Sequence, residues 1–394
     1  PGAMNDSAPD RPLRILVVAG EASGDAYGAA LMDHLRADSP RPLVFRGIGG
    51  DAMRAAGLEL ICHCDQTAVI GFWEVLRQAR FFSRLLRRMT GELDTWRPDL
   101  VLTIDYPGFN LRLAARAHAS GIRTVHYICP QVWIWHRSRV HTIARHIDQL
   151  ITIFPFEPAC FDQTPLRPLY AGHPLVDQAL ETLARPEPPL PWAEGHRVAL
   201  LPGSRDREIR TLLPVMVAAA VRLEAQAGAC SFLIPAASAR MRAAIEAQMA
   251  RCPARPARLA LVDGQAREVL RQARAAAIAS GTATLEASLM RCPSVLVYRI
   301  SWLSYPIMRW ILRGIGHVGL ANIVTGRTVM PELLQQALTP EALARQLHRF
   351  LTEPAAREAA LAGLDEVNAR LGGGGALAAA AAAMLREWPA PRNP

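Results

Sequence analysis

The sequence predicts two consecutive α/β domains, each a doubly wound parallel sheet covered by helices, with a cleft between the two. Short apolar runs alternate with stretches of helical spacing, and this alternation stops at a proline-rich segment and then begins again. Neighbouring parallel strands are usually joined through a helix, so a parallel sheet requires such an alternation. The length of 394 residues agrees, because a domain usually has roughly 100–200 residues.

Each half contains clear strand signals. The first strand, residues 13–19, is rich in valine and leucine, and a glycine turn and helical spacing over residues 26–36 follow it. The other strands expected in the first half are residues 100–104, 124–128 and 150–154. Those expected in the second half are residues 198–201, 231–234, 259–262, 276–279 and 294–298, with a helix around residues 209–226.

The domain boundary follows from the interruption at residues 184–196. Closely spaced prolines leave no periodicity there, and we interpret the segment as lying in or just after a linker. We expect one domain at residues 4–175 and a second at residues 176–364. Beyond them the tail is helical, with a glycine break and then an alanine-rich stretch that carries an apolar stripe. Helices within residues 365–388 are therefore expected to complete the first domain.

The composition excludes several chemistries. All 44 basic residues are arginines, against 35 acidic residues, so the net charge is +9. Without lysine the chain has no pyridoxal Schiff base, no phosphate-loop lysine and no kinase strand lysine. The arginines are not gathered into one tail and no nucleic-acid motif appears, so we expect a diphosphate substrate or an anionic lipid surface rather than nucleic acid.

The cysteines and apolar runs indicate the compartment. Seven scattered cysteines predict a reducing, cytosolic environment. The sequence Cys62-His63-Cys64 has no second ligand pair at zinc-site spacing, so no metal is expected. Arginines interrupt every long apolar run, so any contact with a membrane is expected to be peripheral.

Two candidate segments follow strands of the first half. Ser23 and Gly24 lie in a glycine turn that opens a helix without the dinucleotide G-x-G-x-x-G pattern. They either bind a polar ligand through the backbone or only form a capped turn. Asp105 directly follows an apolar strand, where it would act as a general base on a hydroxyl group or cap the next helix. Asn110 adds a hydrogen-bonding side chain to the same loop and is a candidate for binding substrate.

Two further candidate segments follow strands of the second half. In Gly203-Ser204-Arg205 a glycine, a hydroxyl group with two amides and a planar guanidinium group suit a phosphate. Gly281 and Thr282 precede a helix where a diphosphate would be favoured, and Glu286 would accept hydrogen bonds from a ribose diol. The alternative for this last segment is a run of small residues that allows the helix to pack closely on the sheet.

A basic amphipathic helix is predicted over residues 72–89. Its arginines fall on one arc and apolar side chains on the opposite arc, with additional aromatic residues beyond that stripe. A second aromatic and basic segment spans residues 302–313. Both suit an anionic membrane or acyl chains, although an ordinary surface helix also explains the first. The candidate residues for this surface are Phe72, Trp73, Leu76, Phe82, Trp302 and Trp310.

An ordered set of segments carries a family resemblance. The segments are Gly20–Asp25, Gly47–Gly50, Asp105 with Pro107, Phe109 and Asn110, His126 with Pro130, Val132, Trp133 and Trp135, Phe154–Glu157, Gly172-His173, Leu201–Arg205, Ser280–Glu286, and Asn322. In this order they resemble bacterial lipid-A-disaccharide synthase, over about residues 13–340. Each segment alone is a weak signal, whereas their order is specific.

The resemblance implies a glycosyltransferase of the B-type fold, with two Rossmann-like domains and neither metal nor cofactor. It implies transfer of 2,3-diacylglucosamine from UDP to the 6-hydroxyl group of 2,3-diacylglucosamine 1-phosphate, with inversion, giving the β-1,6 disaccharide 1-phosphate and UDP. The first domain would bind acceptor and lipid, and the second the UDP-sugar. By matching position, Asp105 is the base, and Arg205 and Glu286 belong to the UDP-binding half. Asn322 lies in a loop at the nucleotide and is a candidate for binding it.

The resemblance further implies peripheral association with the cytoplasmic face of the inner membrane, and a homodimer.

The chain departs from the family pattern at Gly108, where relatives often carry a second aspartate, and before Asn322, where a common proline is missing. Two other readings stay open: another UDP-sugar enzyme of this fold, which would not need the apolar segments, and a non-catalytic protein that binds UDP-sugar or lipid.

Overall fold

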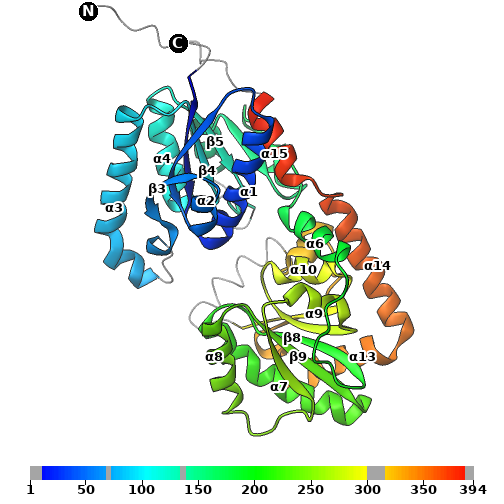
Figure 1. Ribbon diagram of the computed structural model, residues 1–394. Helices are drawn as coiled ribbons and strands as arrows, with labels where there is room; N and C mark the ends of the chain where they lie inside the picture. The colour runs from blue at the N-terminus through cyan, green and yellow to red at the C-terminus, as the bar shows by residue number, and fades with distance from the viewer. Residues whose placement is uncertain (1–10, 68–71, 134–138, 300–315, 387–394) are drawn as a thin grey trace, which may run out of the picture. The chain divides into compact units, whose positions relative to one another are not determined.

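The computed structural model describes residues 11–67, 72–133, 139–299 and 316–386, without the side chains of residues 72–79. It divides into two compact units (Figure 1). Unit 1 combines residues 1–174 with residues 374–394, and unit 2 comprises residues 175–373. Of the candidate residues, Trp302 and Trp310 lie outside the described residues, as do the side chains of Phe72, Trp73 and Leu76.

Unit 1 contains a seven-stranded sheet in the order β3-β2-β1-β4-β5-β6-β7, in which neighbouring strands are parallel. Its strands are β1 (Leu13–Ala19), β2 (Leu43–Gly49), β3 (Leu58–His63), β4 (Leu100–Ile104), β5 (Arg123–Tyr127), β6 (Gln149–Thr152) and β7 (Leu169–Tyr170). The central strand β4 is buried along its whole length, as expected for a sheet covered on both faces.

Helices cover both faces of this sheet. They are α1 (Ala22–Asp38), α2 (Asp51–Ala55), α3 (Phe72–Thr95), α4 (Pro107–Ala119), α5 (Arg139–His146) and, from the end of the chain, α15 (Ala376–Arg386). α3 and α4 lie on one face and α1 and α15 on the other (Figure 1). α15 buries mainly alanines and Met384 rather than its leucines, and the Gln149 side chain donates a hydrogen bond to the Ala383 carbonyl oxygen (3.1 Å).

Unit 2 contains a six-stranded parallel sheet in the order β10-β9-β8-β11-β12-β13. Its strands are β8 (His196–Leu201), β9 (Cys230–Ala236), β10 (Leu259–Asp263), β11 (Ala275–Ala279), β12 (Ser294–Tyr298) and β13 (Glu332–Leu334). Its helices are α6 (Pro174–Ala184), which begins at the unit boundary, α7 (Asp206–Ala227), α8 (Ala239–Met249), α9 (Ala266–Gln272), α10 (Ala283–Leu289), α12 (Leu320–Thr325), α13 (Pro340–Thr352) and α14 (Pro354–Leu371). α7, α8 and α13 bury one face of this sheet in a large apolar core.

The predicted fold class, two Rossmann-like parallel-sheet domains, is confirmed. Of the strands, β1, β4 and β12 begin and end where the sequence predicted, while β2, β3, β7 and β13 were not predicted. The unit boundary falls between Pro174 and Leu175. Residues 365–373, which we expected to complete the first domain, form the end of α14 and the two glycines after it, and they belong to unit 2.

The proline-rich segment is not a free linker, contrary to one interpretation of the sequence. It follows α6 within unit 2 and is fastened to α9. The Gln272 amide donates to the Pro188 carbonyl oxygen (2.8 Å) and accepts from the Trp192 indole N–H (3.0 Å), while Arg271 donates to the Arg185 carbonyl oxygen (2.9 Å). Within the described residues, the structure contains no helix that is long and apolar enough to span a bilayer.

Candidate functional site

Asp105 lies at the carboxyl end of β4, in the middle of the unit 1 sheet. Asp105 and Tyr106 both have left-handed backbone conformations, with φ of 47° and 49°. Two consecutive left-handed residues other than glycine are strained, and such strain is characteristic of functional sites. The Asp105 amide donates to the Tyr127 carbonyl oxygen at the end of β5 (2.9 Å). The strained turn therefore begins directly after β4, at a residue that is still hydrogen-bonded to the neighbouring strand.

The Asn110 side chain fixes this turn by hydrogen bonds to its backbone. It is fully buried on the first turn of α4, and its amide nitrogen donates to the carbonyl oxygens of Asp105 (2.7 Å), Ile104 (3.1 Å) and Val18 (3.5 Å). These carbonyl groups close β4 and β1, so the side chain joins the ends of two neighbouring strands. Asn110 was predicted to bind substrate; the structure instead places its amide nitrogen inside the fold, where it orients Asp105.

Tyr106 closes the other side of the turn. Its ring lies so close to Gly20 that a Cβ atom there would be 2.4 Å from the Tyr106 Cγ atom. The Tyr106 hydroxyl group donates to the Thr67 carbonyl oxygen (3.0 Å), and the Thr67 hydroxyl group donates to the Gly20 carbonyl oxygen (2.9 Å). The glycine after β1 is therefore required by the approach of an aromatic ring.

The Asp105 carboxyl group is suited to accept a proton. Burial raises its pKa, an N–H of Tyr106 lowers it, and the negative charge of Glu21 raises it again. A raised pKa makes the carboxylate a stronger base while it is ionised. The side chain is only partly buried, so it is accessible to a substrate hydroxyl group.

The turn after β1 is built around Asp25 rather than Ser23. The buried Asp25 carboxylate accepts hydrogen bonds from the amides of Gly50 (2.6 Å), Ala52 (3.0 Å) and Met53 (3.0 Å) at the start of α2. Asp25 thus satisfies the first amides of a neighbouring helix. Ser23 is exposed on the first turn of α1. Gly24 is buried, and a Cβ atom there would meet Ala19 at 3.3 Å.

In unit 2, Gly203-Ser204-Arg205 follows β8 and opens α7, as predicted. Gly203 has φ of 102°, and a Cβ atom there would meet the Glu208 carboxylate at 2.2 Å. That carboxylate accepts the Ser204 amide hydrogen (3.1 Å) and pairs with the Arg205 guanidinium group (3.1 Å). The Arg205 side chain is 69% exposed, so a phosphate group can approach it. Sequence reasoning missed Glu208, which lies on the first turn of α7 and accepts from the Ser204 amide four residues earlier.

Gly281, Thr282 and Glu286 follow β11, the strand next to β8. Gly281 and Thr282 are exposed. Glu286 lies on α10, where burial raises its pKa and an ion pair with Arg267 (3.3 Å) opposes that rise. Arg267 also donates to the Gln178 side chain (2.9 Å). Parallel neighbouring strands place the segments after β8 and β11 at the same edge of the sheet, and the sequence had not revealed Arg267.

Asn322 is fully buried on α12 and is saturated with hydrogen bonds. Its carbonyl oxygen accepts from the amides of Val329 (2.8 Å) and Met330 (2.9 Å), and its nitrogen donates to the Met330 carbonyl oxygen and to Glu332 (2.8 Å each). The Glu332 carboxylate also accepts from the Gly319 amide (2.9 Å). A direct contact of Asn322 with the nucleotide, which the resemblance implied, would have to break this network.

The basic helix is confirmed in its described part. Arg80, Arg84, Arg87 and Arg88 of α3 are exposed. On the opposite side Leu85, Leu86 and Met89 are buried in the core, and Phe81 and Phe82 pack against it. Phe81 and Leu85, which lie beyond the apolar stripe predicted for this helix, thus also pack in the core. Phe82 is likewise partly buried and offers less apolar surface to a membrane than predicted.

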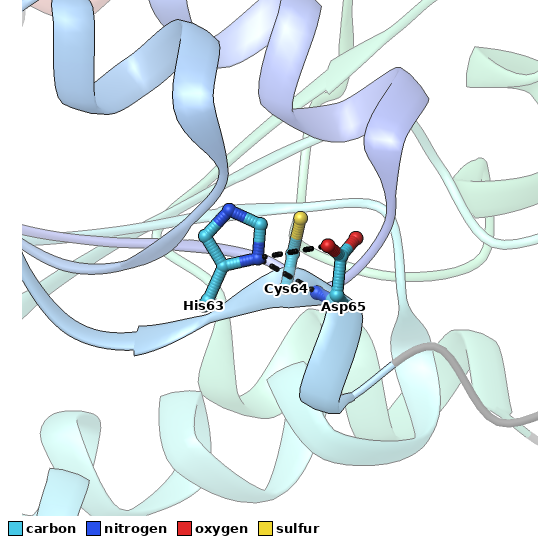
Figure 2. Close-up of side chains that lie close together, drawn as sticks. All are labelled: His63, Cys64 and Asp65. Carbon is cyan, nitrogen blue, oxygen red and sulfur yellow. Dashed lines mark hydrogen bonds and ion pairs between the residues drawn. The ribbon is translucent and has the colours of Figure 1, made fainter.

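One group of potential metal ligands is present in the described residues. His63, Cys64 and Asp65 bring their ligand atoms within 4.8 Å of one another, as Figure 2 shows. His63 Nδ1 accepts the Asp65 amide hydrogen (3.3 Å), and burial and the charges of Asp25 and Asp65 raise the pKa of Cys64 to about 11. The Asp65 side chain is 81% exposed, and exposed acidic groups commonly lie beside such residues without a metal, so we assign no metal to this group.

Comparison with known proteins identifies the family. The family model described as lipid-A-disaccharide synthetase matches residues 15–378. The chain belongs to this family. The lipid-A-disaccharide synthase of Anaeromyxobacter dehalogenans (strain 2CP-C) is 40% identical over 370 residues, 91% of this chain and 93% of that protein. That of Myxococcus xanthus (strain DK1622) is 40% identical over 370 residues, 92% of this chain and 94% of that protein. The family resemblance drawn from the ordered motifs is confirmed.

Solved structures support the fold of the lipid-A-disaccharide synthase family. UDP-GlcNAc 2-epimerase from Neisseria meningitidis, bound to UDP-GlcNAc, has a TM-score of 0.64 and 12% identity over 95% of this chain and 100% of that chain. The glycotransferase of kitacinnamycin has a TM-score of 0.63 and 15% identity over 96% and 100%. Such distant likeness shows the fold alone. The family match confirms the predicted enzyme class, a UDP-sugar glycosyltransferase.

Removing the Asp25 carboxylate by Asp25→Ala should leave three amides at the start of α2 without their acceptor. Losing such a helix cap costs about 0.5–2 kcal/mol, and we expect the upper end because the group is buried. Urea unfolding monitored by circular dichroism measures this loss. The exposed neighbour Ser23→Ala is the control and should change the free energy of unfolding by less than about 0.5 kcal/mol. Equal losses in the two variants would refute the role of Asp25.

Proposed function

We propose that the chain transfers 2,3-diacylglucosamine from UDP-2,3-diacylglucosamine to the 6-hydroxyl group of 2,3-diacylglucosamine 1-phosphate. The products are the β-1,6-linked disaccharide 1-phosphate and UDP. The observation that carries this proposal is the family match over residues 15–378, with Asp105 on the strained turn inside it. No step in this mechanism calls on a metal or a cofactor.

Asp105 acts as the general base. Its carboxylate takes the proton of the acceptor hydroxyl group while the oxygen attacks the anomeric carbon of the donor. The bond from that carbon to the UDP oxygen breaks at the same time, so the configuration inverts. The raised pKa of Asp105 and its fixed backbone support this role, because a base contributes most when it is both strong enough and correctly placed.

Unit 2 binds the UDP group. The exposed Arg205 guanidinium group offers two parallel donors to the diphosphate, and it stabilises the negative charge that develops on the leaving UDP. Gly203 and Ser204 supply backbone that a phosphate can approach, and Gly281 and Thr282 lie at the end of the neighbouring strand. Glu286, oriented by Arg267, accepts hydrogen bonds from the ribose diol. Asn322 contributes indirectly, by holding the loop at Gly319 through Glu332.

The protein associates peripherally with the cytoplasmic face of the inner membrane. The exposed arginines of α3 support this part of the proposal, since an anionic lipid surface attracts each of them. The acyl chains of both substrates require an apolar surface, for which Phe72, Trp73, Leu76, Phe82, Trp302 and Trp310 remain our candidates. We also propose a homodimer, which light scattering tests directly.

Release of UDP tests the function. Purified protein is supplied with UDP-2,3-diacylglucosamine and either acylated or non-acylated glucosamine 1-phosphate, and UDP is measured by a coupled assay. Release that requires the acylated acceptor supports the proposal. Release with both acceptors would favour another UDP-sugar enzyme, and binding of UDP without release would favour a non-catalytic protein.

Replacing the base by Asp105→Ala should lower kcat at least about 100-fold, because general base catalysis typically contributes 10²–10⁴ in rate. The fold and the affinity for UDP should not change, since the nucleotide is held by other residues. Initial rates and calorimetry measure the two quantities. Asp38→Ala, at the exposed end of α1, is the control and should retain the wild-type rate. Near-normal turnover of Asp105→Ala would remove this residue from the mechanism.

Arg205→Ala should weaken the binding of UDP at least about tenfold, because hydrogen bonds to charged groups contribute about 1.5–3 kcal/mol. Isothermal titration with UDP measures the dissociation constant directly. Arg210→Ala removes an exposed arginine further along α7 and serves as the control for a general loss of positive charge. A dissociation constant that does not change in Arg205→Ala would contradict the assignment.

Replacing Arg80, Arg84, Arg87 and Arg88 together by glutamine should reduce binding to anionic vesicles at least about tenfold, since each arginine near such a surface contributes about 1 kcal/mol. Flotation with phosphatidylglycerol vesicles measures the bound fraction. The combined variant Arg251→Gln and Arg255→Gln, on an exposed loop of unit 2, should bind as the wild type does. Unaltered flotation of the α3 variant would show that this helix face does not bind the membrane.

A further inference from the structure

A second carboxyl group lies where the strands of the unit 1 sheet end, on the same side as Asp105, and it has no role in the proposed mechanism. Glu157 follows β6 and is completely buried. One of its oxygens, Oε2, accepts hydrogen bonds from the amides of Ile153 and Phe154 (3.0 Å each), the two residues that follow the strand. Its other oxygen, Oε1, has no hydrogen-bond partner among the described residues. A buried charge in this state would be far more costly than a neutral carboxyl group.

The strand order places Glu157 and Asp105 at the same edge. β5 lies between β4 and β6, and the carboxyl ends of the strands are linked by hydrogen bonds. The Asp105 amide donates to the Tyr127 carbonyl oxygen at the end of β5, and the Ile128 amide donates to the Ile151 carbonyl oxygen of β6 (3.0 Å). The turn that Glu157 fixes therefore continues the edge on which Asp105 lies.

The surroundings of Glu157 favour its neutral form. The Phe154 ring packs on the Trp133 ring and on the His173 ring, so this turn is enclosed by aromatic groups. Three acids of the described residues interact electrostatically with Glu157: Asp105 after β4, Cys129 after β5 and Tyr170 of β7. The base beside the turn is His173, and burial lowers its pKa to about 4, which favours its neutral form at pH 7. Burial raises the pKa of Glu157 to about 8, the two amides oppose this rise, and the charge of Asp105 adds to it.

We propose that Glu157 is a positioning residue of the glycosyl transfer, a neutral acid that fixes the turn after β6 and leaves Asp105 as the ionised carboxyl group of the pair. When two carboxyl groups lie in different environments, the more deeply buried one commonly stays protonated while the other is ionised. An ionised Glu157 would place a buried negative charge on an oxygen that has no hydrogen-bond partner in the described part of the chain, and relieving that charge would move the turn that continues the edge on which Asp105 lies. This inference rests on the role proposed for Asp105.

Carbon-13 NMR of the full chain labelled at the glutamate carboxyl carbons tests the proton directly. The resonance assigned to Glu157, by its absence in Glu157→Gln, should titrate near pH 8. In Asp105→Asn the same resonance should titrate at lower pH by at least about half a unit, because the like charge is gone. Titration of Glu157 at the ordinary glutamate pKa, or no shift in Asp105→Asn, would overturn the inference. These outcomes do not depend on enzymatic activity and so remain separate from the proposed function.

The pH profile of kcat/KM tests the positioning role. Glutamine retains an oxygen for the two amides and cannot ionise, so Glu157→Gln should keep a rate within about threefold of wild type at pH 7. Above about pH 8 the wild-type rate should fall as Glu157 loses its proton, and the Gln variant should not follow this fall. Glu194→Gln, at an exposed position, is the control and should follow the wild-type profile. A purely structural residue would give parallel profiles, and parallel profiles would overturn the inference.

Discussion

The placement of Asp105 depends on the buried amide of Asn110. This one nitrogen donates to carbonyl oxygens at the ends of β1 and β4, and so it compensates for the cost of a turn with two left-handed residues. The cost of such conformations is about 1–3 kcal/mol for each residue, which surrounding hydrogen bonds must offset. The ring of Tyr106 against Gly20 closes the turn from the other side. The carboxylate is therefore held by backbone geometry, and its side chain is left available for chemistry.

The strands that the sequence predicted most accurately are those whose signal is local. β1 and β4 are apolar except for Arg14 and Thr103, and the sequence pattern alone was enough to predict their bounds. β2 escaped prediction because Arg46 and Gly47 break its pattern; Gly47 has φ of 151°, and a Cβ atom there would lie 1.8 Å from the Val17 carbonyl oxygen. β7 is only two residues long and is recognisable only by its pairing with β6.

The site could be predicted in position but not in detail. Asp105 and Arg205 follow strands, and residues after parallel strands are brought to one edge whatever their partners are. The roles of Asn110, Asp25 and Asn322 depend on hydrogen bonds to residues that the sequence does not bring together, such as the pairing of Asp25 with Gly50. Arg267 of unit 2 escaped notice for the same reason, because it meets Glu286 only in the folded protein.

The last helix has a consequence for how the protein is made. α15 follows all of unit 2 in the chain, yet it packs beside α1, and its Ala383 carbonyl oxygen accepts a hydrogen bond from Gln149 of β6. Chains emerge from the ribosome starting at the amino end, and domains usually fold as they appear. Here the first domain to be synthesised lacks one of its helices until the whole of unit 2 has been made. Until then the surface that α15 covers, beside α1, stays exposed to water.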